Sequence, residues 1–133
     1  MTHHLALVLV VALAPALARA ETPMTAEAFE AHVTGKTLTY QRSGLPFGIE
    51  EYLEGRQVRW SVSPDHCQYG KWYPEGHDIC FVYENDPNPS CWTFWLRQGA
   101  LVALSVSDLP GNELYETARD DLPLPCPGPG VGV

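Results

Sequence analysis

From Lys36 onward, tight turns separate short stretches in which apolar and polar residues alternate, and this pattern constrains the fold more than any other feature. Alternation with a period of two is typical of antiparallel strands that bury one face. We expect the strands to pair in chain order, with one short N-terminal helix, in a mainly β fold that forms a small barrel or a strongly curved sheet. The predicted strands are residues 37–41, 48–53, 56–62, 67–73, 78–84, 90–97 and 100–106.

The hairpins of this meander agree on one apolar face. A two-residue turn at 98–99 pairs Leu96 with Leu101, and a four-residue turn sets Trp72 opposite Ile79. A slip of one residue in either hairpin would move its apolar set to the other face, and no slip is needed. The predicted core face consists of Trp72, Ile79, Phe81, Trp92, Phe94, Leu96, Leu101 and Ala103.

The opposite face of the same strands also carries apolar side chains, including Val82, Val102 and Leu104. Such a face is either covered by another segment or is a binding surface. Exposed Trp and Tyr side chains are typical of binding surfaces. The candidate binding surface consists of the aromatic residues that fall off the predicted core, Trp95, Tyr69, Tyr52 and Tyr73.

Two segments outside the meander have helical signals. Thr25 can cap a helix at residues 26–34, and Met24 and Phe29 stand at the two positions of a hydrophobic staple. Residues 112–119 can form one or two further helical turns. The apolar stripe of the first segment, Phe29 and Val33, is narrow and must pack on another part of the chain.

The four cysteines are too widely spaced for the close pairs that bind zinc, so we expect two disulfides. Cys80 pairs with Cys91, because directly opposed strand positions bring their Cα atoms within disulfide reach. Cys67 then pairs with Cys126 and ties a tail rich in proline and glycine, residues 109–133, across the second face of the sheet.

The first twenty residues are typical of a signal peptide. An apolar run at 5–17 precedes Ala-Arg-Ala at 18–20, which fits cleavage before Glu21. The run is too short to span a bilayer, and no second run follows it, so we expect no membrane insertion. The prediction is a periplasmic or secreted protein whose residues 21–133 form a single β-rich domain.

The charge of the chain limits its partners. The formal net charge is −8, and removal of Arg19 with the signal peptide leaves 7 basic against 16 acidic residues, a net charge of −9. Nucleic acids and anionic membranes are held mainly by Lys and Arg, so neither is an expected partner. A basic envelope or extracellular protein is compatible with this charge, which also serves solubility.

Motifs for catalysis or cofactor binding are missing from the sequence. It contains no G-x-S-x-G, H-E-x-x-H, G-x-G-x-x-G or P-loop pattern, so we expect neither an enzyme nor a cofactor. Glu50 and Glu51 form a carboxylate pair, but adjacent strand residues point to opposite faces and cannot act on one bond. We interpret the pair as a solvated strand edge.

Patterns of residues that bind metal ions are also missing from the sequence. The candidate donors have neither helical nor strand spacing, so no metal site is expected. The acidic segment 84–89 lacks the ladder of alternate acids that binds calcium, and a hairpin loop is the simpler interpretation. The donors considered are His66, His77, Asp78 and Glu75.

A series of short motifs carries a resemblance to a known group. Gly70-Lys-Trp72, Cys80-Phe-Val-Tyr83 and Cys91-Trp92 form a G-x-W, C-F-x-Y, C-W series on successive predicted strands. This series resembles small exported bacterial proteins of unknown function over roughly residues 36–130, which implies a fold but no activity. In size, charge and cysteine use the chain also looks like periplasmic lysozyme-inhibitor barrels.

Three classes of function remain open. A module that binds a basic protein or a small apolar ligand is our first hypothesis, and a structural or envelope-maintenance protein without a discrete site is the second. A hydrolase with an unrecognised site is the third. A cavity lined by Trp60, Trp72 and Trp92 would favour a ligand-binding barrel, a filled interior would favour a structural role, and a cleft with a histidine near a serine or a carboxylate would favour the hydrolase.

Overall fold

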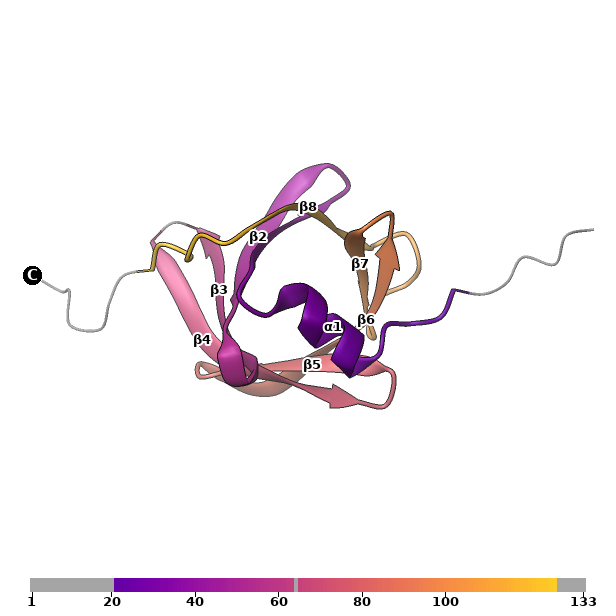
Figure 1. Cartoon of the computed structure of the whole chain (residues 1–133), viewed down its shortest axis with the longest axis horizontal. Helices are drawn as coiled ribbons and strands as arrows, with labels where there is room; N and C mark the ends of the chain where they lie inside the picture. The colour runs from indigo at the N-terminus through magenta and orange to yellow at the C-terminus, as the bar shows by residue number, and fades with distance from the viewer. Residues whose placement is uncertain (1–20, 64, 127–133) are drawn as a thin grey trace, which may run out of the picture.

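Eight antiparallel strands follow one another around a closed barrel, in which each strand pairs with its neighbour in sequence and β8 pairs with β1 (Figure 1). The computed structural model describes residues 21–63 and 65–126, so the predicted signal peptide and its cleavage site lie outside the described residues. A short helix, α1, precedes the strands, and a single 3-10 turn, η1, links β2 to β3. The elements are α1 (Ala26–Val33), β1 (Thr37–Arg42), β2 (Leu45–Tyr52), η1 (Glu54–Arg56), β3 (Gln57–Ser63), β4 (His66–Glu75), β5 (Asp78–Tyr83), β6 (Asp86–Arg97), β7 (Ala100–Ser105) and β8 (Leu114–Asp120).

The helix forms where the sequence predicts it and packs inside one end of the barrel. The Thr25 hydroxyl accepts a hydrogen bond from the backbone N–H of Ala28 at 3.1 Å, which caps the first turn. Phe29 and Val33 are fully buried, and Figure 1 shows α1 within the ring of strands. The turns β2–β3, β4–β5 and β6–β7 share this end with α1. The other turns and the β7–β8 loop lie at the opposite end, called here the far end.

The predicted pairings hold for two of the three hairpins. Leu96 pairs with Leu101, and Cys80 pairs with Cys91. The turn between β4 and β5 is tighter than predicted, so Trp72 lies opposite Phe81 instead of Ile79. The difference is two residues, which preserves the face of every side chain.

Two other expectations about the strands and the core are wrong. Residues 112–119 do not form helical turns: Leu114–Asp120 is strand β8, which pairs with β1 along most of its length and closes the barrel. Leu96 is half exposed, because it lies beside the β6–β7 turn at the rim of the barrel. The other seven residues of the predicted core face point into the barrel, with Trp92 only partly buried.

Both predicted disulfides are present. The Cα atoms are 4.0 Å apart in Cys80–Cys91 and 5.7 Å apart in Cys67–Cys126. The second bridge holds the tail against the outside of the barrel, where Leu124 is buried and its backbone N–H donates to the Glu51 carboxylate at 2.8 Å. No helix among the residues that the structure describes is long and apolar enough to cross a membrane.

Candidate functional site: an interior cavity beside a buried carboxylate

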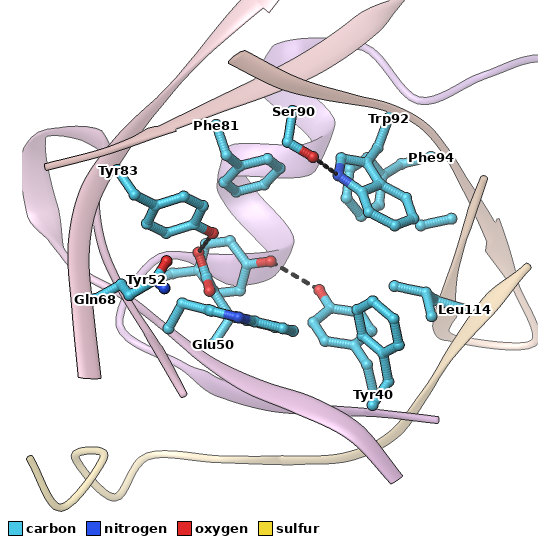
Figure 2. Close-up of a pocket in the computed structure, with 13 residues that line it drawn as sticks. Tyr40, Glu50, Tyr52, Gln68, Phe81, Tyr83, Ser90, Trp92, Phe94 and Leu114 are labelled. Carbon is cyan, nitrogen blue, oxygen red and sulfur yellow. Dashed lines mark hydrogen bonds between the residues drawn. The ribbon is translucent and has the colours of Figure 1, made fainter. Parts of the chain in front are cut away.

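The far half of the barrel encloses a cavity of about 190 Å³ (Figure 2). Its walls are mostly aromatic, and all eight strands contribute side chains to them, β8 only through its first residue, Leu114. The lining residues are Tyr40, Phe47, Glu50, Tyr52, Trp60, Gln68, Phe81, Tyr83, Ser90, Trp92, Phe94, Ala103 and Leu114.

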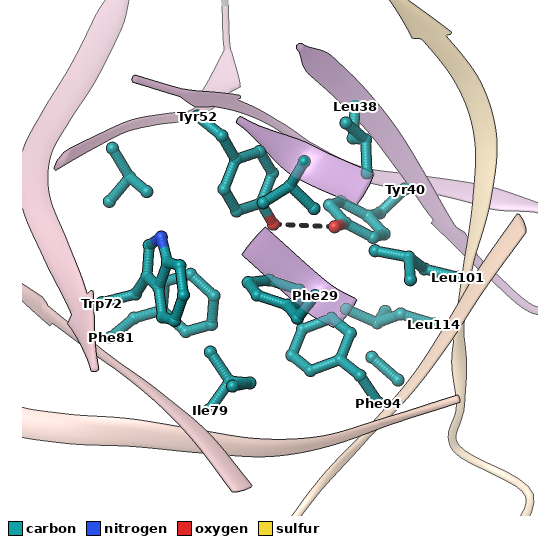
Figure 3. Close-up of a cluster of buried hydrophobic side chains, with 13 residues drawn as sticks. Phe29, Leu38, Tyr40, Tyr52, Trp72, Ile79, Phe81, Phe94, Leu101 and Leu114 are labelled. Carbon is teal, nitrogen blue, oxygen red and sulfur yellow. Dashed lines mark hydrogen bonds between the residues drawn. The ribbon is translucent and has the colours of Figure 1, made fainter. Parts of the chain in front are cut away.

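The helix determines where this cavity stops. Phe29 of α1 lies at the centre of an aromatic cluster, with its ring centroid 4.6 Å from that of Phe94 and 5.1 Å from that of Trp72 (Figure 3). The Tyr40 and Tyr52 hydroxyls are hydrogen-bonded to each other at 2.8 Å. Both tyrosines belong to the buried core and also line the cavity, so this pair marks the boundary between the filled and the hollow halves of the barrel.

A β-bulge directs Phe47 into the mouth of the cavity. The pairing of β1 with β2 skips one residue between Gly48 and Pro46, and bulges of this kind re-aim a side chain. The Phe47 ring centroid lies 5.8 Å from that of Trp60 and 6.3 Å from that of Trp92. Three partly buried aromatic rings from β2, β3 and β6 therefore meet at the far end of the cavity.

The position of Trp60 requires the glycine beside it. A Cβ atom added at Gly48 would lie 2.3 Å from the six-membered ring of the Trp60 indole. Any larger residue at this position would therefore displace Trp60 from the barrel wall. The close approach of backbone and indole leaves the cavity its present width.

Glu50 is the one acidic residue in the cavity lining, and its side chain is almost fully buried. Its Oε1 atom accepts a hydrogen bond from the Tyr83 hydroxyl at 2.9 Å (Figure 2). The Oε2 atom is buried and has no hydrogen-bond partner among the described residues. Burial raises the pKa of Glu50 well above its usual value, and the hydrogen bond from Tyr83 opposes this shift only in part.

The two adjacent glutamates have different environments. Glu50 points into the barrel, whereas Glu51 points outward and pairs with Arg59 at 2.9 Å and with the tail. The expectation that they face opposite sides is correct, but the solvated-edge interpretation is wrong, because both are more than nine-tenths buried. One signal could have located Glu50: it has the parity of Tyr52 and pairs directly with Trp60.

The candidate binding surface does not form one site. Tyr52 is in the core and lines the cavity, so the prediction that it lies off the core is wrong. The cause is the parity of β2, which turns the side chain of Tyr52 inward with that of Glu50. Tyr69 and Tyr73 lie on β4 and Trp95 lies on β6, all three partly buried and outside the cavity lining, with β5 between the two strands.

The predicted metal donors are not brought together. His66 begins β4, whereas Glu75 ends it and His77 follows in the next turn, so the two histidines are at opposite ends of the barrel. Among the described residues, one cluster has metal-ligand spacing, and it combines Glu75 with two cysteines whose sulfur atoms are already joined in a disulfide. The 84–89 segment is the β5–β6 turn and the start of β6, as the hairpin interpretation predicts.

A histidine and a carboxylate do meet elsewhere. His32 Nε2 lies 3.0 Å from the Glu116 carboxylate, which also accepts a hydrogen bond from the backbone N–H of Leu101. Neither side chain lines the cavity. The contact joins α1 to β8 and supports the short β7–β8 seam, where only two residue pairs are in register.

Comparison of the chain with protein-family models, with curated proteins and with solved structures finds no match.

Proposed function

We propose that this protein is a binding module that holds a small, largely apolar molecule in the barrel cavity. The observation that carries the proposal is the cavity itself, lined by two of the three expected tryptophans, Trp60 and Trp92, whereas Trp72 lies in the filled core. Protein interiors are close-packed, so a cavity larger than a water molecule is a departure that calls for a reason. Concave sites with apolar walls and few polar groups are where small ligands bind.

The cavity volume limits the ligand. A dry apolar cavity of about 150 Å³ accommodates benzene, so about 190 Å³ accommodates one ring with a short substituent. The flat faces of Phe47, Trp60 and Trp92 suit an aromatic or cyclic ligand, because offset and edge-to-face ring contacts contribute beyond the area that they bury. Entry is through the far end, opposite α1, where these rings are partly exposed.

The competing classes have less support. A structural role fits a filled interior, and a hydrolase needs a histidine in the cleft, whereas His32 lies outside the cavity lining. Absence of catalysis stays a prediction. Binding of a basic protein to the acidic outer surface also stays a prediction, and screening by salt would weaken such an interaction.

Binding of toluene and indole to the oxidised domain, residues 21–133, tests the proposal. We expect saturable shifts of the amide resonances of cavity residues in two-dimensional NMR spectra. The variant Ala103→Leu, which adds three carbon atoms to the cavity wall, should bind both probes more weakly. The matched control is Trp95→Phe on the outer face, which should bind them normally. Absence of saturable binding to the folded wild-type domain, or loss of binding only in the control, would refute the proposal.

A further inference from the structure

We infer that the ligand is a compact ring-bearing primary amine, whose ammonium group donates a hydrogen bond to the unpartnered Oε2 atom of Glu50. The inference rests on the proposed function, and it assigns the chemical class of the ligand. Its starting point is an acid that the barrel encloses and leaves half satisfied.

Neither protonation state of Glu50 is satisfied by the protein. An ionised carboxylate here has one hydrogen bond, from Tyr83, and no Lys or Arg among the described residues acts on it. A neutral carboxyl group either carries its proton on Oε2, where no acceptor among the described residues receives it, or donates it from Oε1 to the Tyr83 oxygen and leaves Oε2 as an unpartnered acceptor. Unpartnered buried polar groups cost free energy and are rare in native structures. A ligand nitrogen with N–H donors and a positive charge would satisfy the ionised state completely.

Of the remaining polar groups of the cavity, two pairs are already satisfied, and Gln68 is the one uncharged amide. The Tyr40 and Tyr52 hydroxyls bond to each other, and the indole N–H of Trp92 donates to the Ser90 hydroxyl at 2.9 Å. Gln68 also lines the cavity. No side chain in the lining is basic, so an anionic ligand has no partner there.

The aromatic walls favour a cation over a neutral ligand. The faces of aromatic rings carry negative electrostatic potential and attract ammonium groups, most strongly in sites shielded from water. Trp60, Trp92 and Phe47 form the mouth, and Tyr83 stands beside Glu50. An amine that enters therefore meets aromatic faces before it reaches the carboxylate.

The charge at the mouth also favours a cation. Acidic residues occupy the described turns at the far end, and low-dielectric walls concentrate their field on an approaching cation. Arg42, the basic residue of the β1–β2 hairpin there, is paired with Asp108 at 3.3 Å and covers the Phe47 ring. The acidic residues of the far-end turns are Asp65, Glu84, Asp86, Asp108 and Glu113.

Binding of an amine is linked to proton release. The titratable groups that face Glu50 are the phenols of Tyr83, Tyr52 and Tyr40, and burial raises the pKa of each, so all three stay neutral. Because burial also raises the pKa of Glu50, an ammonium ligand binds with loss of the carboxyl proton. Amine affinity should therefore increase as the pH rises toward the pKa of Glu50 in the free protein.

The experiment compares 2-phenylethylamine, 2-phenylethanol and toluene by isothermal titration calorimetry on the oxidised domain. The variants are Glu50→Gln, which removes the charge at nearly constant shape, and Glu54→Gln, which removes a charge from the exposed turn at the α1 end. We expect Glu50→Gln to weaken amine binding at least about 30-fold and to leave toluene binding unchanged. Glu54→Gln should bind all three probes as the wild type does.

The outcomes separate the two proposals. Equal amine affinity in Glu50→Gln and wild type, with toluene bound by both, would overturn the amine assignment and leave the ligand-binding barrel standing. Stronger binding of 2-phenylethanol than of the amine would also overturn it. Failure of all three probes to bind the folded wild type would overturn the proposed function itself. If Glu50→Gln does not fold, titration of the wild type in buffers of different ionisation enthalpy decides: net proton release on amine binding supports the assignment, and no release overturns it.

Discussion

Replacing Glu50 by glutamine should change how the stability of the barrel depends on pH. Burial raises the pKa of Glu50 in the folded state above the ordinary value of 4.5, so the native state binds this proton more tightly than the unfolded chain does. The stabilising contribution of the neutral acid is therefore fully present below about pH 4.5 and is lost as the pH rises through the folded pKa. Glutamine has no proton to lose, so Glu50→Gln lacks this dependence.

The size of the effect follows from linkage. Between the unfolded and the folded pKa of Glu50, each pH unit should lower the free energy of unfolding of the wild type by about 1.4 kcal/mol relative to Glu50→Gln. Solvent screening should not reduce this change in the free energy of unfolding, because the Glu50 side chain is almost fully buried.

Urea denaturation of both proteins between about pH 5 and pH 8 measures this difference. The neighbouring variant Glu51→Gln is the control, because Glu51 contacts Arg59 and the backbone N–H of Leu124 on the outside of the barrel. It should destabilise the fold, because glutamine carries no charge to pair with Arg59 and has one oxygen where the carboxylate has two that accept hydrogen bonds. A wild type that gains stability relative to Glu50→Gln as the pH rises would refute the assignment of Glu50 as a buried, neutral acid.

Three further variants test the packing. Phe29→Ala removes the centre of the aromatic cluster and should cost about 3–5 kcal/mol of unfolding free energy in urea titrations; a cost below about 1 kcal/mol would show that α1 does not fill the barrel. Gly48→Ala should push the Trp60 indole into the cavity, so that indole binds more weakly and the Trp60 side-chain resonances shift; unchanged indole affinity would contradict the close packing. Replacing Cys67 and Cys126 together by serine opens a link across 59 positions and should cost about 4 kcal/mol in the chain-entropy treatment; an unaltered denaturation midpoint would show that the tail does not stabilise the barrel.

Local pairing is what the sequence predicts best. The β6–β7 hairpin is closed by a short turn, so the opposition of Leu96 and Leu101 depends on only a few residues. The Cys80–Cys91 bridge is equally local, and its prediction also sets the register of the two strands. The error in the β4–β5 turn does little damage, because a shift of two residues keeps every side chain on its face.

Strand β8 could not be predicted in the same way. Its residues contain good helix formers, and Leu114 is its only buried apolar side chain. It becomes a strand because β1 offers an unpaired edge, and this pairing joins segments far apart in the sequence. Pairing with β1 therefore overrides the local helix propensity of these residues. The same pairing closes the curved sheet into a barrel.

The interior of the barrel was harder to predict, because a residue can only be called inward once the barrel is known to close. Alternation places Glu50 on the side of Tyr52, yet a charged residue in a strand is ordinarily assigned to solvent. The bulge that turns Phe47 inward breaks the alternation altogether, so no pattern of period two could place it in the mouth. Both residues that give the cavity its character therefore depart from the rule that predicts the rest of the barrel.

Two features of the interior gain a common explanation if the cavity is a binding site. A larger residue at Ala103 would fill part of the cavity, and an apolar residue of similar volume at Glu50 would remove a buried polar atom without a partner. Either change is of the kind that commonly stabilises a barrel, and the chain has neither. The satisfied pairs Tyr40–Tyr52 and Trp92–Ser90 show that the same interior can pair its polar groups where nothing else is to be bound. A void and an unpartnered acceptor that adjoin each other inside the barrel are most simply two parts of one site whose missing contacts a ligand supplies.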